Sequence, residues 1–341
     1  MTLSVGLVGF GLAGRVLHAP LILHAGMRIA SVVTSQADLV HSSIPGAQVF
    51  NDVDSLLASN SLDIVVITTP NHLHTPEALA ALQAGKHVVI DKPMCITGSE
   101  ASTLIKAAHH YNRTLTVFHN RRWDSDFLTL KKLLHENTLG DITEYEANWD
   151  RWRPEVGDRW RDHAQSGSGM LFDLGPHLID QALMLFGMPE WLQADVYQQR
   201  AGAATDDAFV IRMGKGSLRF TLSVNSLAVT SRARFRVQGL RGTWIKYGLD
   251  IQESQLRSGM TPDHSEYGLE PSSSWGVLST PDSEERQVEA SRGNWSVFYE
   301  NLVQHLEQQA PLAVTGAQAM DVINIIAAAR DSSERGVRVK L

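Results

Sequence analysis

The chain has 341 residues and a net charge of −7 at pH 7. A chain of this length is better divided into two domains than packed around one core. The negative charge and the lack of a basic run argue against nucleic-acid binding. The single cysteine, Cys95, excludes a disulfide framework. No apolar run reaches the ~20 residues that span a bilayer, and the sequence enters a strand at once, so we expect no signal peptide and a cytoplasmic protein.

The chain opens with a predicted strand at residues 4–8, followed directly by a glycine-rich turn. In a strand-turn-helix unit the first glycine permits the tight turn, the second lets a pyrophosphate approach the backbone, and the third lets the helix pack closely. A helix over 13–25 and a strand over 28–34 complete the unit. This context favours a dinucleotide site over a plain glycine-rich turn, formed by Gly9, Phe10, Gly11, Leu12, Ala13 and Gly14.

Strands and helices keep alternating to about residue 118. Asp52, Thr75 with Pro76 at the first helical position, and Thr97 or Ser99 are predicted to open the next helices. Repeated strand-helix units give a parallel sheet, so residues 1–120 are predicted to form a Rossmann dinucleotide-binding domain. The strands of this series are expected at 47–50, 64–68, 88–90 and 115–118.

Polar residues follow two of these buried strands, where open α/β sheets bind their ligands. Asp91 and Lys92 stand after the strand at 88–90, and a lysine is rarely placed at such a rim for packing. Lys92 is therefore a candidate for the reaction centre. The loop after the strand at 64–68 is expected to contact the cofactor through Thr69, Pro70, Asn71 and His72.

His72 and His74 in this loop also resemble half a metal site. A third ligand at a defined spacing is missing from the sequence around them. We therefore predict no metal, and we interpret the loop as one that opens the next helix and contacts the cofactor.

The pattern changes after residue 120. Sequential strands joined by short turns at 214–216 and 240–242 argue for an antiparallel sheet. Residues 121–341 are predicted to form an α+β substrate and oligomerisation domain with a large, mostly antiparallel open sheet. An uncovered sheet face would be an apolar patch unless another copy covered it, so we expect a homo-oligomer. The strands are expected at 143–149, 194–199, 208–213, 217–224, 233–238 and 243–247, the helices at 127–136, 171–186, 295–308 and 317–334, an irregular excursion at 250–287 and a short segment at 337–341.

Asp173 and His177 stand four residues apart, which puts both on one face of a helix. Pro176 is compatible with a first helical turn, so Asp173 could also lie just before the helix. Histidine titrates in the range useful for a proton acceptor, and a nearby carboxylate could orient it. The alternative is a helix-capping aspartate and a packed histidine. Asp180, one turn further on, is the next candidate.

Two segments, 119–124 and 149–154, combine arginines with tryptophans. Such pairs suit a polyhydroxylated ligand, because guanidinium groups bond to hydroxyls and flat rings contact C–H faces. The alternative is a cluster of salt bridges and stacked arginines. The residues predicted to contact substrate are Arg121, Arg122, Trp123, Arg151 and Trp152.

The motifs together resemble the Gfo/Idh/MocA family of NAD(P)-dependent sugar and cyclitol oxidoreductases over essentially the whole chain. Within it they are most similar to the bacterial NADP-dependent scyllo-inositol dehydrogenases. Where this chain has Asp91, the family usually has glutamate, which shifts the charge by about one methylene. The segments that carry the resemblance are residues 9–14, 91–93, 119–124, 244–248 and Asp250.

The resemblance implies that Lys92, Asp173 and His177 form the catalytic set, over a sheet that packs against another subunit. The carbinol C–H would give its hydride to nicotinamide C4 while His177 takes the hydroxyl proton. Asp173 would bind the substrate or orient His177, and Lys92 would hydrogen-bond the substrate oxygen. The family is not uniform about whether lysine or histidine accepts the proton.

Cofactor choice depends on the end of the second strand, where an acid binds the ribose 2′-hydroxyl and an arginine accepts a 2′-phosphate. Here stand Thr34, Ser35 and Gln36, and the resembling NADP enzymes have arginine at the position of Gln36. Without a carboxylate to repel the phosphate, and with Asp38 a few residues too late, we expect NAD(P) with a slight preference for NADP. The alternative functions are an aldose or dihydrodiol dehydrogenase and a non-catalytic sensor of dinucleotide.

Overall fold

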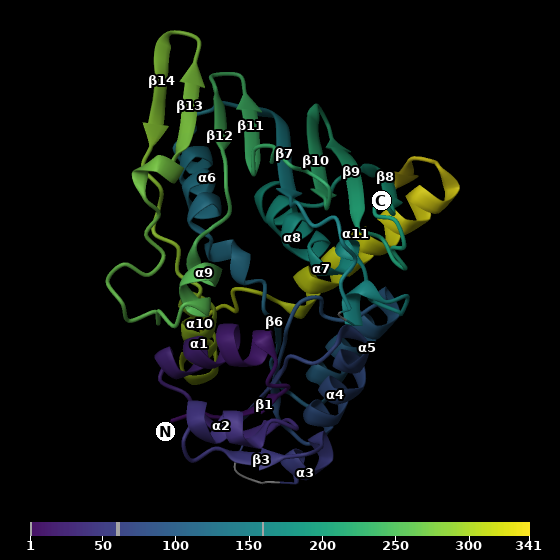
Figure 1. The fold of residues 1–341 in the computed structure, drawn as a ribbon, viewed down its shortest axis with the longest axis vertical. Coiled ribbons are helices and arrows are strands. Elements are labelled where there is room, and N and C mark those ends of the chain that lie inside the picture. The colour runs from purple at the N-terminus through teal and green to yellow at the C-terminus, as the bar shows by residue number, and fades with distance from the viewer. Residues whose placement is uncertain (1, 59–61, 159) are drawn as a thin grey trace. The chain divides into compact units, whose positions relative to one another are not determined.

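The computed structural model describes residues 2–58, 62–158 and 160–341, and the chain divides into two compact units (Figure 1). Unit 1 comprises residues 1–120, 252–267 and 294–323, and unit 2 comprises 121–251, 268–293 and 324–341. Unit 1 thus takes two later segments in addition to the residues assigned to it from the sequence. Within the described residues no helix is long and apolar enough to cross a membrane.

The sheet of unit 1 has six strands in the order β3-β2-β1-β4-β5-β6, and every neighbouring pair is parallel. All of β4 and the last three residues of β5 are buried β-branched residues, as expected for a sheet that helices cover on both faces. The strand order reverses between β1 and β4, and the carboxyl ends of these strands form the ligand crevice of such folds. The predicted Rossmann sheet is confirmed. The strands are β1 (Ser4–Val8), β2 (Arg28–Val33), β3 (Gln48–Phe50), β4 (Ile64–Ile67), β5 (His87–Ile90) and β6 (Leu115–Val117).

Two helices of unit 1, α3 (Val53–Leu57) and α5 (Gly98–His110), begin at residues whose side chains bond to the first backbone N–H groups. Asp52 accepts from the Ser55 amide at 2.8 Å, and Thr97 and Glu100 form a reciprocal capping box. In Figure 1, α4 and α5 lie side by side. The elements are η1 (Ala13–His18), α1 (Ala19–His24), α2 (Ala37–Ser43), α3 (Val53–Leu57), α4 (Asn71–Gln83), α5 (Gly98–His110), α9 (Gln252–Arg257) and α10 (Ser296–Gln308), together with the start of α11 (Gly316–Arg335).

The predicted start of α4 at Thr75 and Pro76 was wrong, because this helix begins at Asn71 and contains Pro76. The ring of His74 is held by two backbone carbonyls, Pro93 O at 2.8 Å from Nδ1 and Thr69 O at 2.9 Å from Nε2. These contacts come from the strand-end loops and fix the first turn before Pro76. Tertiary contacts therefore outweigh the local preference of proline for the first helical position.

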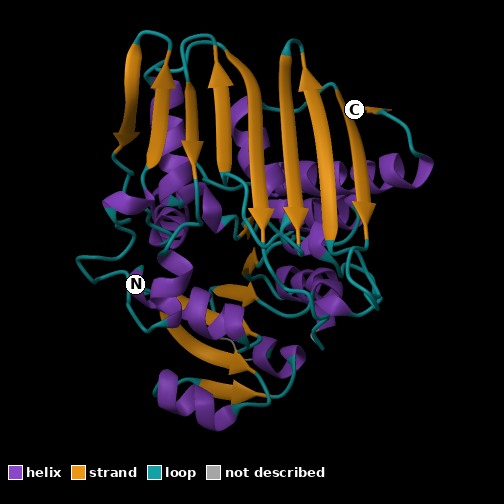
Figure 2. Cartoon of the chain, turned by 45° about the horizontal axis from the view of Figure 1, so that its top comes forward, coloured by secondary structure: helices purple, strands orange, loops and turns teal. Residues whose placement is uncertain are grey.

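The sheet of unit 2 has nine strands in the order β14-β13-β12-β11-β7-β10-β9-β8-β15. All pairs are antiparallel except β7 and β10, which run parallel, so the predicted open α+β sheet is confirmed. Figure 2 shows its strands in front, with helices behind them. The strands are β7 (Ile142–Asp150), β8 (Trp191–Tyr197), β9 (Ala208–Lys215), β10 (Leu218–Asn225), β11 (Phe235–Gly239), β12 (Thr243–Lys246), β13 (Gly276–Thr280), β14 (Ser283–Val288) and β15 (Val339–Lys340), and the helical elements are η2 (Asn120–Trp123), α6 (Ser125–His135), η3 (Trp160–Asp162), α7 (Met170–Asp173), α8 (Gly175–Phe186), η4 (Ser272–Ser274) and the end of α11.

The interpretation of residues 250–287 as one irregular excursion was wrong. This stretch contains α9, η4 and the hairpin of β13 and β14, which widens the sheet by two strands. The sequence of β14, Ser-Glu-Glu-Arg-Gln-Val, is exposed along almost its whole length. An edge strand of this kind pairs through its backbone and keeps charged side chains in water, so it carries no hydrophobic alternation.

The uncovered face of this sheet carries charged side chains on β7 and β11. Along β7 the side chains of Tyr145 and Ala147 are buried, and the ring of Tyr145 contacts Phe186 of α8, 5.3 Å away. The alternate residues point to the other face. There Arg236 Nη1 donates to Glu144 Oε2 at 2.6 Å and to Glu146 Oε1 at 3.1 Å. A charged ladder thus lies on part of the uncovered face, opposite the side that packs on α8.

Candidate active site

The glycine turn after β1 has the geometry that close approach of a phosphate requires. Gly9 has φ +94°, and its N–H donates to Val33 O at 3.0 Å. A Cβ at Gly14 would lie 2.3 Å from Gly9 O, so only glycine lets the helix start so near the turn. A Cβ at Gly11 would meet no other atom of the described residues within 4 Å. The first and third glycines therefore serve the fold, and the second leaves the backbone open to a ligand.

The end of β2 presents neutral polar groups. Thr34 donates its N–H to Phe50 O at 3.0 Å, and its Oγ1 accepts from the Gln36 N–H at 3.1 Å. Ser35 and Gln36 are exposed, and Asp38 lies in the first turn of α2. Hydroxyl and amide groups at this position suit either a ribose hydroxyl or a phosphate.

Lys92 lies two residues after the end of β5, at the carboxyl edge of the parallel sheet. Its backbone N–H donates to Asp91 Oδ1 at 2.9 Å, so the carboxylate folds back onto the chain at Lys92. Burial alone raises the pKa of Asp91, but hydrogen bonding and charge from His18, with Lys92 and His74, hold that pKa below its usual value. The carboxylate therefore stays ionised beside Lys92 at neutral pH.

The loop after β4 leads into the first turn of α4, which begins at Asn71. Asn71 is buried and His72 is exposed there, whereas both ring nitrogens of His74 face the backbone carbonyls described above. Thr69 Oγ1 donates to Glu77 Oε2 at 2.6 Å, and burial raises the pKa of Glu77. The hydrogen bonds of His74 thus connect the end of β4 to the loop that carries Lys92.

In unit 2, Asp173 is the last residue of α7 and His177 is the third of α8. The helix breaks at Leu174, so Asp173 lies just before the helix of His177, one of the two placements that the sequence allowed. Arg161 Nη1 is 3.4 Å from Asp173 Oδ1. The His177 ring stacks on Trp149, with centroids 5.8 Å apart and planes 27° from parallel. A carboxylate and an oriented imidazole thus stand on adjoining helical turns.

Arginines surround the indole of Trp149. The guanidinium of Arg121 lies 4.5 Å from the ring centroid, and those of Arg151 and Arg234 lie 5.3 Å from it. Contacts of this kind orient a flat ring in a buried site. Trp149 in turn supports His177, so the cluster fixes the plane of the imidazole.

The predicted substrate contacts divide between the two interpretations offered for them. Arg122 donates to Asp180 through Nε at 2.8 Å and Nη2 at 2.6 Å, a buried fork that matches the salt-bridge alternative. Arg121 stacks on Trp149 and is bonded to Asp124 at 3.1 Å. Trp152 is 56% exposed, so its ring can meet a ligand.

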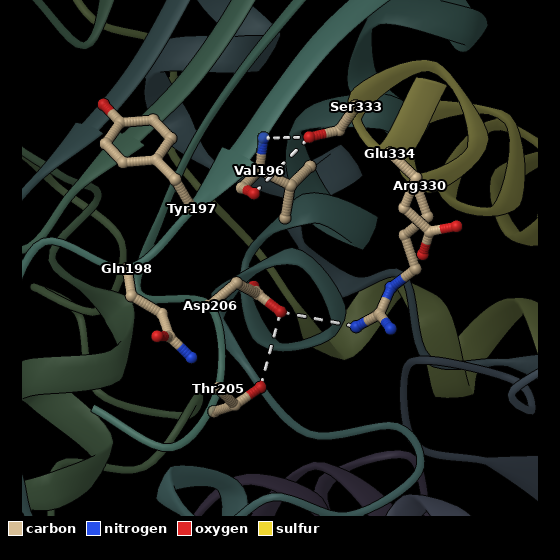
Figure 3. Close-up of a pocket in the computed structure, with 8 residues that line it drawn as sticks. All are labelled: Val196, Tyr197, Gln198, Thr205, Asp206, Arg330, Ser333 and Glu334. Atoms are coloured by element: carbon tan, nitrogen blue, oxygen red, sulfur yellow. Dashed lines mark hydrogen bonds and ion pairs between the residues drawn. The ribbon is translucent and has the colours of Figure 1, made fainter. Parts of the chain in front are cut away.

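Asp206 is a residue of this region that the sequence analysis missed. Its Oδ2 accepts the N–H of Leu171 at 2.7 Å and its carbonyl oxygen accepts that of Met170 at 2.9 Å, so it holds the start of α7. Figure 3 shows it between Thr205 and Arg330 in a pocket of about 420 Å³, and Arg330 Nη2 is 3.3 Å from its Oδ1. Burial raises the pKa of Asp206. An aspartate in a loop 33 residues after Asp173 gives no sequence signal for such a role.

His18 and Tyr299 of unit 1 were missed as well. His18 Nδ1 and the Tyr299 hydroxyl are 2.5 Å apart, and His18 Nε2 is 3.6 Å from Asp91 Oδ1. The three residues are brought together from η1, α10 and the end of β5. Their separation in sequence, up to 281 residues, hides the cluster from any local pattern.

A parallel sheet with this glycine turn after its first strand is typical of dinucleotide-binding proteins. Comparison with known proteins agrees. Residues 3–119 match the family model for the NAD-binding Rossmann fold of the GFO_IDH_MocA oxidoreductases, and residues 131–341 match that for their C-terminal alpha/beta domain. The chain belongs to the Gfo/Idh/MocA oxidoreductase family, which confirms the predicted NAD(P)-dependent dehydrogenase.

Relatives match along almost the whole chain. The scyllo-inositol 2-dehydrogenase (NADP(+)) IolW of Bacillus subtilis (strain 168) is 38% identical over 337 residues, covering 98% of this chain and 94% of the relative. The uncharacterized oxidoreductase YdgJ of Escherichia coli (strain K12) is 41% identical over 328 residues, covering 95% and 94%. The solved structure of the oxidoreductase yvaA from Bacillus subtilis has a TM-score of 0.97 at 38% identity and covers 100% of this chain and 98% of that one.

Proposed function

We propose that this protein transfers hydride between NADP and a cyclitol or sugar alcohol, converting an inositol-like carbinol to its ketone or the reverse. The observation that carries the proposal is Lys92, ionisable and at the carboxyl end of β5 in a Rossmann unit. The full-length similarity to an enzyme named for scyllo-inositol and NADP supports the choice of substrate class and cofactor.

The glycine turn would hold the pyrophosphate, because Gly11 leaves its backbone open and Gly9 and Gly14 fix the turn. When bound, the nicotinamide supplies the hydride acceptor or donor at its C4. Thr34, Ser35 and Gln36 would bind the adenosine ribose or its phosphate, and Thr69, Pro70, Asn71 and His72 would line the same crevice. With no carboxylate at the end of β2, a 2′-phosphate meets no repulsion there, which favours NADP.

The protein's own residues would then manage the proton. His177 takes the hydroxyl proton of the carbinol as the hydride leaves, and its plane is set by Trp149. Asp173, on the preceding helical turn, binds the substrate or orients His177, and Lys92 donates a hydrogen bond to the substrate oxygen. In the reverse direction the same groups return the proton to the developing alkoxide.

Trp152 and Arg151 would contact the polyol, because an exposed flat ring suits C–H faces and a guanidinium suits hydroxyls. We assign Arg121 and Arg122 to the support of Trp149 and Asp180 instead, and keep Trp123 as a predicted contact. These assignments define a polyol as the class of ligand and do not specify one stereoisomer.

We also propose that copies of the chain associate through the uncovered face of the nine-stranded sheet, as the family resemblance implies. The Arg236 ladder with Glu144 and Glu146 offers charges of both signs for a self-complementary contact. Light scattering coupled to gel filtration tests this proposal. A monomer at all concentrations contradicts it, and a dimer or larger species that Arg236→Glu dissociates supports it.

The reaction is tested by following reduced nicotinamide absorbance during a screen of polyols, with NADP and NAD in parallel. Lys92→Ala and His177→Ala should each lower turnover by orders of magnitude while cofactor binding, titrated by fluorescence, is retained. Lys106→Ala, on the exposed side of α5, is the matched control and should behave as the unmodified protein. Turnover of no polyol contradicts the proposed function, normal turnover in either variant contradicts that residue's role, and a large preference for NAD contradicts the cofactor assignment.

A further inference from the structure

A chain of three side chains runs through unit 1 to the backbone of Lys92. Tyr299 of α10 lies 2.5 Å from His18 Nδ1, and His18 Nε2 lies 3.6 Å from Asp91 Oδ1. The same Asp91 oxygen accepts the Lys92 N–H at 2.9 Å. His18 has no exposed surface. Two helical segments far apart in sequence are therefore linked, through one buried imidazole, to the residue on which the proposed reaction depends.

The tautomer of His18 follows from its neighbours. Burial, with the negative charge of Asp91, raises the pKa of Tyr299 well above its usual value, so the group remains a hydroxyl. If this hydroxyl donates to Nδ1, the ring proton stands on Nε2 and faces the carboxylate. The opposite tautomer would turn a bare nitrogen lone pair toward Asp91, which is repulsive. The Asp91 carboxylate, which can only accept, thus selects the tautomer with the proton on Nε2, and the Tyr299 hydroxyl completes it by donating to Nδ1.

The position of His18 Nε2 also indicates Asp91 as the partner of the imidazole. Nε2 is buried and has no hydrogen-bond partner within 3.5 Å among the described residues. A buried donor left unsatisfied is costly, and the Asp91 carboxylate at 3.6 Å is in ion-pair range. Phe118 packs against the ring, with centroids 4.1 Å apart, and holds it in place. The ring is thus held with Nε2 toward the carboxylate.

We propose that His18, oriented by Tyr299, is a positioning residue that holds the Asp91 carboxylate on the Lys92 amide and so fixes where the Lys92 side chain begins. This inference rests on the proposed function, because Lys92 is its reacting partner. It also accounts for Asp91: a carboxylate on the shorter side chain stays near the backbone, where it can accept the next residue's N–H and face His18. His18 and Tyr299 touch neither reactant in this proposal.

Two isosteric substitutions separate positioning from packing. The amide nitrogen of a glutamine reaches the place of Nε2, whereas that of an asparagine reaches only the place of Nδ1. His18→Gln should keep kcat within about 3-fold, whereas His18→Asn should lower it by about 10- to 100-fold, the range that a misplacement of about 1 Å produces. KM for the polyol should stay within about 2-fold in both, since substrate contacts are intact. Equal kcat losses in the two variants, or a loss confined to KM, would overturn the proposal.

A second measurement does not need turnover. Nitrogen-15 NMR of the histidine rings should show a protonated Nε2 and an unprotonated Nδ1 for His18, identified by the signal missing from His18→Gln. Tyr299→Phe, which keeps the ring and removes one oxygen, should shift the Nδ1 signal, because this nitrogen loses its hydrogen-bond donor. The reversed tautomer in the unmodified protein, or no change in Tyr299→Phe, overturns the positioning role even if polyols are oxidised. The expected signature in a protein that oxidises no polyol supports the buried chain and refutes only the proposed function.

Discussion

Substituting the second and third glycines of the turn separately tests the division of labour within it. In Gly14→Ala the new Cβ would lie 2.3 Å from Gly9 O, more than 1 Å inside the ordinary contact range that begins at 3.4 Å. The neighbour is backbone, so the turn and η1 must move apart by about that amount. Overpacking of this kind costs about 1–3 kcal/mol of stability. The displacement also removes the close approach that a pyrophosphate needs.

Gly11→Ala is the matched control. Its Cβ meets no other described atom within 4 Å, and no positive φ is recorded for Gly11, so the fold accepts it. The chain should gain about 0.4–1 kcal/mol from the reduced freedom of the unfolded state. The same methyl occupies the path of the pyrophosphate, so we expect NADPH affinity to fall by at least about 10-fold, equivalent to about 1.4 kcal/mol.

Urea unfolding and fluorescence titration with NADPH measure the two effects on the same samples. Gly14→Ala should lose stability and binding together, and Gly11→Ala should lose binding alone. Unchanged affinity in Gly11→Ala would refute the assignment of the open backbone to the pyrophosphate. Unchanged stability in Gly14→Ala would refute the steric reasoning about the third glycine.

Three further predictions concern buried and half-buried polar groups. Asp180→Ala leaves the buried guanidinium of Arg122 without its fork partner, so urea unfolding should show a loss of about 3–5 kcal/mol, which a simultaneous Arg122→Met should largely restore. Burial, with the charge of Arg113, lowers the pKa of His87 to about 4, and its Nδ1 accepts the Thr114 N–H. Because the folded-state pKa lies below the unfolded value of about 6.5, the stability from neutral His87 is complete above pH 6.5 and is lost as the pH falls toward 4. Unfolding midpoints at pH 8 and pH 5 should therefore differ less in His87→Gln than in the unmodified protein, and an equal difference would contradict the shift. Asp206→Ala frees the start of α7 and should lower kcat about 10-fold with cofactor affinity unchanged, as stopped assays and titration would show.

Local chemistry made much of the fold predictable. The glycine turn after β1 and the capping residues Asp52 and Thr97 act within a few positions of the chain, so their effects are visible in the sequence. Buried β-branched runs marked the parallel strands in the same way. The prediction missed the charged strand β14 and misplaced the start of α4 at Pro76. In both cases strand pairing or packing against other segments, rather than the local sequence, determines the secondary structure.

The candidate site divides along the same line. Sequence motifs pointed to Lys92, Asp173 and His177 because each stands at a strand end or on one helix face. The groups that orient them are remote in sequence: Tyr299 lies 281 residues from His18, and Arg234, just before β11, lies 85 residues from Trp149. No periodicity connects such residues.

The sequence by itself determined the Rossmann unit, the open second sheet, the dinucleotide turn and the candidate reacting groups, because each depends on steric and hydrophobic rules acting over a few residues. Only the tertiary structure decided which side chains hold those groups in place. In the folded chain Arg122 pairs with Asp180, and the ring of His177 stacks on Trp149. Asp206 bonds to the start of α7, and His18 connects Tyr299 to Asp91. These contacts form only when distant segments pack together, so their physical cause is long-range burial, which no local pattern records.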